Sequence, residues 1–207
     1  MISLAFLAKA EGPVGGRAIA EAAERGFAAT SPQARAALPR LLRALARAID
    51  APSITKQTGA LRLTEVSWQE AAPDGGSQAL VRALVDARIL VQGGGDNDAQ
   101  RVRLAHEAVL RSWPRAHDLV AAHANFFRVR AEVTAAEERW RRHQAENGGR
   151  GADAFLLAPG VPLAEAADMR QQFANELPPS LLAFIDKSSA RARRQLRRLG
   201  LPPSCLR

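Results

Sequence analysis

The chain has 207 residues, 47% of them hydrophobic, which is enough to bury the core of one sizeable domain or two small ones. Aromatic residues make up only 5%, Tyr is absent and alanine is abundant, which favours a mostly α-helical chain. The single cysteine, Cys205, excludes an internal disulfide framework. The apolar start, Met1–Ala10, has no basic region before it, and no run approaches the roughly 18 apolar residues of a membrane-spanning helix. We expect a cytoplasmic protein with no signal peptide and no membrane anchor.

The charge of the chain is unevenly distributed. Lys and Arg number 29 against 21 Asp and Glu, a formal net charge of +8. Much of the excess lies near the C-terminus, in Arg191, Arg193, Arg194, Arg197 and Arg198. Such a cluster would attract nucleic acid or anionic lipid. The alternative is a solvated linker helix, and we favour it here because no aromatic stacking residues interleave with the arginines.

The N-terminal part predicts two helices. The first, Ile2–Ala10, is stopped by a Glu-Gly-Pro sequence, and Gly15-Gly16 then allows a turn before the second, which runs from Arg17 to about Ala28. These glycines do not form a phosphate-binding P-loop, because that motif needs Lys and Ser or Thr directly after the glycines. No such run occurs in the sequence, so we expect no enzymatic activity of this chain by itself.

A third helix is predicted to start at Ser31, with Pro32 at its first helical position, and to run to about Asp50. Pro39 lies inside this pattern and is expected to kink the helix. The segment Ser53–Ser67 alternates weakly between polar and apolar residues, which indicates a short strand pair.

The central part predicts a helix, a strand, a glycine-rich loop and a second strand. Their ranges are Ser77–Arg88, Ile89–Gln92, Gly93–Gln100 and Arg101–Leu104. Ser77 is the expected N-cap of the helix. The second strand passes directly into another helix, which places His106 and Glu107 at a helix start. This order is typical of a winged helix, in which the loop between the strands is the wing.

The C-terminal part predicts packed helices. Pro114 is expected to bend or restart the chain after Trp113. A three-four alternation then indicates a buried seam of Leu119, Ala122, Phe126, Val129, Val133, Ala136 and Trp140. The pairs Glu137–Arg141 and Glu138–Arg142 are expected on the exposed side of this helix. Glycines at 148, 149 and 151 indicate a flexible joint near residues 147–151, followed by helices over Val161–Phe173 and Ser180–Leu199.

The sequence L-V-D-A-R-I-L-V from Leu84 and the sequence V-R-L-A-H-E-A-V-L-R-S-W-P-R from Val102 resemble a known family. They are similar to the winged helix and helical linker of bacterial signal-transduction ATPases with numerous domains (STAND ATPases), of the novel STAND NTPase 1 type. Looser similarity continues through Asn125–Arg128, Trp140, Phe155–Leu157, Pro162–Ala166 and Phe184-Ile185. The resemblance implies a mostly α fold divided into the tail of a preceding helical segment (1–13), a winged-helix regulatory domain (14–113) and a helical linker (114–207).

The resemblance also implies a function. Because the P-loop core is missing, the chain is expected to be a non-catalytic fragment, from a truncated or split gene, that couples the nucleotide state of that core to a C-terminal sensor or effector. Such sensors are often WD-repeat propellers. The expected partners are the core and the sensor or effector, with an oligomeric active state. ADP or ATP with Mg²⁺ would be bound only in the parent protein.

One residue stands out in this comparison. Relatives carry a Met-His-Asp-like triplet at the same strand-to-helix junction, and its histidine contacts the β-phosphate of ADP. The aligned triplet here is Ala105-His106-Glu107. His106 is therefore the candidate ADP contact, since an imidazole N–H and free backbone N–H groups at a helix start both suit a diphosphate. The alternative is a histidine that caps or packs locally.

A metal site is not expected. The pair His106-Glu107 begins like a zinc-protease motif, but the position of the second histidine is Leu110. The remaining histidines, His117, His123 and His143, are most simply solvated.

The competing function is a DNA-binding winged helix. Its recognition helix would offer only Arg82 and Arg88 as cations, with Asp86 between them. The wing carries Asp96 and Asp98 where phosphate contacts require Lys or Arg. On this basis nucleic acid is not an expected partner.

Overall fold

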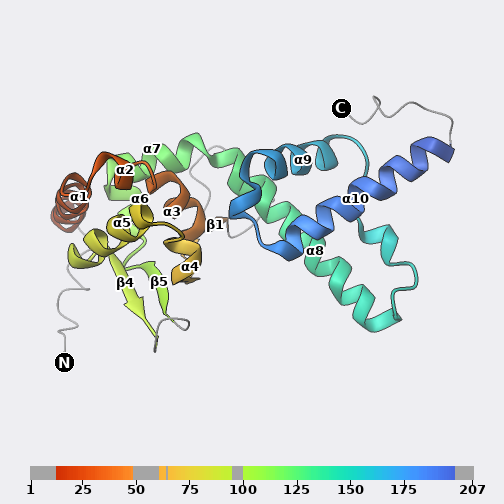
Figure 1. Ribbon diagram of the computed structural model, residues 1–207, viewed down its shortest axis with the longest axis horizontal. Helices are drawn as coiled ribbons and strands as arrows, with labels where there is room; N and C mark the ends of the chain where they lie inside the picture. Colours follow the sequence, from red (N-terminus) through yellow and green to blue (C-terminus); the bar gives the residue numbers. More distant parts are fainter. Residues whose placement is uncertain (1–12, 49–60, 64, 95–99, 199–207) are drawn as a thin grey trace. The chain divides into compact units, whose positions relative to one another are not determined.

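The computed structural model describes residues 13–48, 61–63, 65–94 and 100–198, and these are mostly helical (Figure 1). They fall into two compact units, of which the first ends at Ala124 and the second begins at Asn125. The predicted helix Ile2–Ala10, the wing residues 95–99 and residues 53–60 of the predicted strand pair lie outside the described residues. None of the described helices is long and apolar enough to cross a membrane.

The described residues of the first unit form seven short or medium helices around an apolar core. They are α1 (Pro13–Ala28), α2 (Pro32–Arg35), α3 (Leu38–Leu45), α4 (Trp68–Ala71), α5 (Gly75–Asp86), α6 (Ala108–Ser112) and α7 (Pro114–Ala122). The largest fully buried side chains of this unit include Leu38, Leu45, Leu80, Leu84, Leu104 and Trp113. The buried residues thus come from α3, α5 and the segment around α6, which ties distant parts of the sequence together.

Helix α1 begins four residues earlier than predicted, at Pro13, so Gly15 and Gly16 lie in its first turn and not in a loop. Proline is favourable there because the first helical N–H has no partner inside the helix. A Cβ at Gly16 would lie 2.8 Å from the Ser112 hydroxyl oxygen, and one at Gly26 would lie 2.8 Å from Ala87 Cβ. These two glycines let α1 approach α6 and α5 closely.

The predicted helix from Ser31 to Asp50 is divided in the structure. Ser31 caps α2 as predicted, with its hydroxyl accepting the Ala34 N–H at 3.2 Å. The chain then breaks before Pro39, which stands in the first turn of α3, and α3 ends at Leu45. The next three residues, β1 (Ala46–Ala48), pair antiparallel with β2 (Leu61–Leu63). The break beside Pro39 agrees with the expected kink, but the predicted end near Asp50 was wrong, because a strand partner replaces the last turns.

A small antiparallel sheet of β3 (Val66–Ser67), β4 (Leu90–Gly93) and β5 (Arg101–Leu104) follows, with strand β5 in the centre. Leu90 lies opposite Leu104, and Val66 lies opposite Val102. All four side chains are buried, whereas Arg101 and Arg103 are exposed, so β5 alternates as the sequence predicts. The sheet therefore buries one face against the helices.

The helix before this hairpin starts differently from the prediction. The N-cap of α5 is Asp74, which accepts the backbone N–H of Ser77 at 2.8 Å and its hydroxyl at 3.0 Å. Ser77 itself is buried inside the first turn. These hydrogen bonds lower the pKa of the Asp74 carboxyl, with the backbone bond from Ser77 as the main cause.

The second unit is a set of antiparallel and crossing helices. It consists of α8 (Ala124–Asn147), η2 (Ala152–Phe155), α9 (Val161–Phe173), η3 (Ala174–Glu176) and α10 (Pro179–Arg198). The predicted seam residues Phe126, Val129, Val133 and Ala136 are buried, which confirms this part of the seam. Phe126 contacts Phe173 of α9 at a ring distance of 4.8 Å, and Trp140 contacts Phe184 of α10 at 5.7 Å. The predicted continuous helix from Leu119 is in fact broken at His123, between α7 and α8.

Glu137 lies on the buried side of α8, contrary to the prediction. Its side chain is only 4% exposed, and its carboxylate pairs with Arg141, whose side chain is 60% exposed, at 2.8 Å. Glu138 and Arg142 form no ion pair in the described part of the chain. A buried carboxylate is costly unless it is paired, so Arg141 has a structural role that its exposure does not reveal.

This arrangement predicts different effects for two neighbouring arginines. Arg141→Ala should lower the free energy of unfolding by about 1 to 3 kcal/mol, because it leaves the Glu137 carboxylate buried without its partner. Arg142→Ala should change it by less than about 0.5 kcal/mol, as expected at an exposed unpaired position. Urea unfolding of the purified variants gives both values.

The double variant provides the control. Adding Glu137→Gln to Arg141→Ala should recover part of the loss, because it removes the charge that was left unpaired. Equal, small losses for Arg141→Ala and Arg142→Ala would contradict this role for Arg141.

Candidate functional site

The candidate nucleotide contact lies where strand β5 passes into helix α6. The strand is held at its end by a hydrogen bond from the Ala105 N–H to the Ile89 carbonyl at 2.9 Å. His106 follows directly and is half-buried, whereas Glu107 is exposed. The structure therefore places His106 at a strand-to-helix junction, as the sequence predicts.

The imidazole of His106 has a defined local contact. Its Nδ1 accepts the backbone N–H of Ala108 at 2.9 Å, so it caps the start of α6. Glu107 makes no side-chain capping bond. An Nδ1 that accepts a hydrogen bond is unprotonated, so the proton of the neutral ring is on Nε2. Nε2 has no hydrogen-bond partner among the described residues, which leaves an N–H donor at this position.

The backbone around His106 differs from the expected anion site. The N–H groups of Val109 and Leu110 donate to the carbonyls of His106 and Glu107 at 3.1 and 3.0 Å. Together with the capped N–H of Ala108, three donors at this helix start are already used. Helix α6 has only five residues, so its dipole is small. Any contact with an anion at the junction would therefore depend on the Nε2–H of His106.

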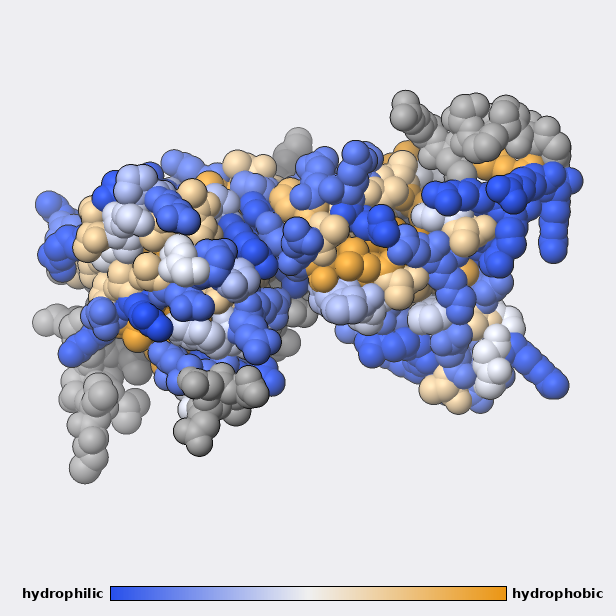
Figure 2. Space-filling model, viewed as in Figure 1, coloured by the Kyte–Doolittle hydropathy of each residue, from blue (hydrophilic) through white to orange (hydrophobic). Residues whose placement is uncertain are grey.

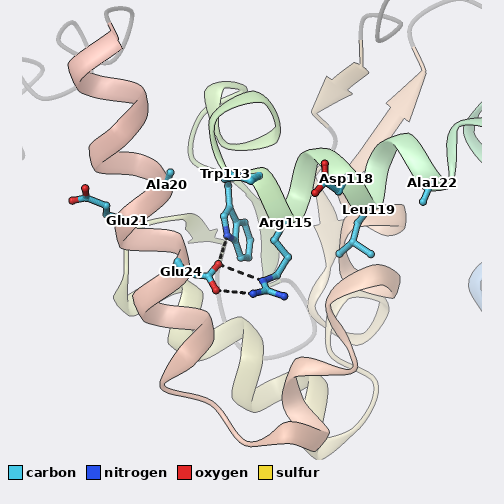
Figure 3. Close-up of a pocket in the computed structure, with 9 residues that line it drawn as sticks. Ala20, Glu21, Glu24, Trp113, Arg115, Asp118, Leu119 and Ala122 are labelled. Carbon is cyan, nitrogen blue, oxygen red and sulfur yellow. Dashed lines mark hydrogen bonds and ion pairs between the residues drawn. The ribbon is translucent and has the colours of Figure 1, made fainter.

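A second candidate site is built on Glu24 of α1. Its carboxylate accepts hydrogen bonds from Trp113 Nε1 at 2.8 Å and from Arg115 Nη2 at 2.8 Å (Figure 3). Phe27 packs edge-on against Trp113 at 5.9 Å, and the Arg115 guanidinium lies 4.5 Å from the Phe27 ring centre. The hydrogen bonds from Arg115, followed by that from Trp113, lower the pKa of Glu24. The same pairing raises the pKa of Arg115.

These residues border an open groove of about 790 Å³ between α1 and α7. Small and apolar side chains form much of its lining, together with three acidic residues, which Figure 3 labels. The lining residues are Ala20, Glu21, Glu24, Trp113, Pro114, Arg115, Asp118, Leu119 and Ala122. No Ser, Thr, Cys, Lys or His lines it. Glu24 is already bound to two partners, Trp113 and Arg115.

A comparison with known protein families identifies the family of this chain. The family model described as Novel STAND NTPase 1 matches residues 9–148, more than half of the chain. The chain belongs to the novel STAND NTPase 1 family. No curated protein and no solved structure matches it. The span shared with this STAND family contains α1, the His106 junction, the groove and α8, whereas α9 and α10 lie outside it.

Sequence analysis did not predict the Glu24 cluster of this STAND family member. Trp113 separates α6 from α7, as the proline after it predicts, but its indole N–H also needs an acceptor. That acceptor lies 89 residues earlier in the chain. The available signals were a tryptophan before a proline and one of two glutamates on α1, and neither identifies the other.

The other histidines are not all solvated. His117 is exposed beside Asp118, in agreement with the prediction. His123 is half-buried, with Nε2 at 2.8 Å from Arg43 Nη1 and Nδ1 at 2.8 Å from the Leu119 carbonyl oxygen. His143 is half-buried near Phe155 and contacts the Arg150 carbonyl at 3.1 Å. The prediction that His123 and His143 are solvated was wrong, because each ring contacts a backbone carbonyl at or just beyond the end of its helix.

The structure also places the residues of the metal and DNA alternatives. Leu110 is buried in the core of the first unit. The described residues contain no group of three or more His, Cys, Asp or Glu that would hold a metal ion. Arg82 is exposed on α5, and Arg88 is exposed after its end with a positive φ of 59°. Asp96 and Asp98 lie outside the described residues.

The Glu24 cluster predicts a pH-dependent contribution to stability. Glu24→Gln should lower the free energy of unfolding by about 1 kcal/mol at neutral pH, because charge-assisted bonds to Arg115 and Trp113 are weakened at a partly exposed site. Glu21→Gln, one turn earlier on the same helix, should change it by less than about 0.5 kcal/mol, since its pair with Arg17 is exposed.

The pH dependence follows from the direction of the shift. A carboxyl whose pKa is lower in the folded state stabilises the protein above its unfolded pKa of about 4.3, and this contribution is lost as pH falls through the folded pKa. The difference between wild type and Glu24→Gln, measured by urea unfolding from pH 7 to pH 3, should therefore shrink at acidic pH. A difference that stays constant over this range would contradict the proposed ionic character.

Proposed function

We propose that this chain is a non-catalytic regulatory part of a STAND signal-transduction ATPase, coupling the nucleotide state of an NTPase core to a sensor or effector domain. Family membership over residues 9–148 supports a STAND-associated role. The 207 residues contain no P-loop motif, so the groups that hold the phosphates of ATP and Mg²⁺ would have to come from another segment or chain.

A winged-helix interpretation of the first unit is part of this proposal. Helix α5 lies between strands β3 and β4, and β4 and β5 form a hairpin in which β5 is the central strand. The segment between β4 and β5 would then be the wing. In such a unit the C-terminal end of the central strand β5, and with it His106, lies at one end of the sheet.

The observation that carries the functional proposal is the geometry of His106. Its Nδ1 is held by the Ala108 N–H, which fixes the ring plane and the tautomer, and its Nε2–H has no partner in the described structure. We infer that this donor binds the β-phosphate of ADP when the core is present. Capping and phosphate binding use different nitrogens, so the two interpretations of His106 are compatible.

The regulatory consequence is one of linkage. ADP favours a closed state only by the difference between its contacts in the closed and open states. A contact that exists only in the closed state, and that contributes about 1.5 to 3 kcal/mol, would change the closed-to-open ratio by roughly tenfold or more.

The chain by itself should not hydrolyse ATP. Turnover measured by phosphate release from the purified 207-residue chain should equal the buffer background, with and without Mg²⁺. Turnover that stays proportional to the chain through two further purification steps would contradict the non-catalytic assignment.

ADP release tests the role of His106 directly. In the protein reconstituted with its ATPase core, His106→Ala should accelerate ADP dissociation about tenfold or more, as measured with a fluorescent ADP analogue. Glu107→Ala should have a smaller effect, since this exposed side chain neither caps the helix nor favours an anion.

Two further variants separate capping from nucleotide binding. The side-chain oxygen in His106→Asn can still accept the Ala108 N–H, but this side chain does not reach the Nε2 position, so release should be fast while stability is kept. His106→Gln reaches farther and carries an amide donor, so it should slow release relative to His106→Asn. If release follows only the loss of thermal stability across the three variants, His106 is a local cap and the proposal fails.

A further inference from the structure

The last three turns of α10 carry a run of cations without carboxylates. From Lys187 to Arg198 the helix contains one lysine and five arginines, namely Lys187, Arg191, Arg193, Arg194, Arg197 and Arg198. The last carboxylate before them, Asp186, is bound to Arg170 of α9 at 2.9 Å. This end of the helix is therefore strongly and uniformly positive.

These arginines have no ionic partner in the described structure, unlike six arginines elsewhere in it. Arg17, Arg103, Arg115, Arg128, Arg141 and Arg170 each form an ion pair with a carboxylate. In the described residues, the five arginines of α10 form no ion pair or hydrogen bond. Lys187 lies over the Trp140 ring at 4.6 Å. Like charges four residues apart, as in Arg193 and Arg197, repel each other, so the fold leaves this cluster uncompensated.

The cations also lie on the accessible side of the helix. The buried residues of α10 are Leu181, Phe184, Ile185, Ser188 and Ala192, which form one stripe. At 100° per residue, Arg193, Arg194 and Arg197 point away from this stripe, and all three are exposed, as is Arg198. In Figure 2, blue hydrophilic atoms make up much of the visible surface at this end of α10.

We propose that the C-terminal half of α10 binds the phosphate backbone of duplex nucleic acid. Residues four apart rise by about 6 Å along the helix, which places Arg193 with Arg197, and Arg194 with Arg198, as two closely spaced rows. Guanidinium groups bind phosphates through paired N–H donors, and the major groove, about 12 Å wide, admits an α-helix. Such contacts need no aromatic stacking, so the lack of aromatic residues argues against single strands only.

The same observations disfavour a lipid surface. An interfacial helix inserts an exposed apolar face into the membrane, but the apolar stripe of α10 is buried in its own unit. None of the exposed large hydrophobic residues in the described structure belongs to α10. The inference revises the expectation that nucleic acid is no partner, which rested on Arg82, Arg88 and the missing aromatic residues.

Fluorescence anisotropy with labelled 20-base-pair duplexes of random DNA sequence, and with the equivalent duplex RNA, tests the proposal on the full chain. If four arginines each neutralise one phosphate, the affinity should fall roughly 100-fold between 50 and 200 mM NaCl, with little dependence on sequence. Changing Arg193, Arg194, Arg197 and Arg198 to Gln should abolish most of the binding and most of its salt dependence. Changing the same four to Lys should retain the salt dependence.

A charge-matched control separates a local site from net charge. Changing Arg25, Arg111, Arg139 and Arg142 to Gln also removes four positive charges, and all four are exposed without an ion pair in the described structure. This control should bind within about threefold of wild type. Circular dichroism should show both variants folded, since the altered residues are exposed.

Three results would overturn the proposal. Equal losses in the α10 variant and in the control would assign the binding to overall charge. Loss only on changing Arg82 and Arg88 would assign it to α5. Binding to phosphatidylserine vesicles or to polyglutamate, with no binding to either duplex at 50 mM NaCl, would assign the cluster to a lipid or an acidic protein.

Discussion

The hydrogen bond from the Trp113 indole to Glu24 is the interaction on which the first unit depends. Burial of a tryptophan stabilises a core strongly, but only if its N–H finds an acceptor. Trp113 is 1% exposed, and its acceptor comes from α1, at the other end of the unit's sequence. Because Trp113 also ends α6 and precedes α7, this one bond ties the turn between the two helices to α1.

The packing around Trp113 also bears on the position of the proposed nucleotide contact, His106. Helix α6 has only five residues, with His106 just before it and Trp113 directly after it. Gly16 lets α1 approach the same helix at Ser112. A short helix held at its C-terminal end and along its side has little freedom to rotate, so α1 helps to position the junction that carries His106, while the bond to Ala108 orients the ring.

The periodic parts of this structure were predictable, and the parts set by distant partners were not. Strand Arg101–Leu104 and helix Val161–Phe173 were predicted with their observed bounds, because each shows a clear local period. The end of α3 depends on a strand 15 residues or more farther along, which no local pattern announces. Asp74 and Ser77 are both good capping residues, and packing decides between them by burying Ser77.

The candidate site also has a part that the sequence predicted and a part that it did not. The position of His106 followed from the sequence pattern, because a strand that runs directly into a helix brings that residue to the junction. Its bond to Ala108 and the occupied N–H groups of α6 depend on the ring orientation and on the tight first turn, which sequence does not specify. The cluster of Glu24, Trp113 and Arg115 could not be predicted, since Glu24 lies 89 and 91 residues from the other two and only the tertiary fold joins them.

In the second unit, buried charged side chains constrain how α8 packs against its neighbours. Glu137 and Arg130 of α8 are 3% and 5% exposed, in the same helix whose apolar seam packs on Phe173 and Phe184. An apolar seam alone tolerates sliding by a turn, because one large side chain replaces another of similar size. A buried carboxylate does not tolerate such sliding. A shift of α8 would keep the ion pair between Glu137 and Arg141, because both lie on this helix, but it would move the Glu137 carboxylate into different surroundings. The ion pair from Arg128 to Glu165 of α9 adds a directional contact between the two helices. Polar contacts therefore specify the register of α8, while its aromatic contacts pack it against α9 and α10.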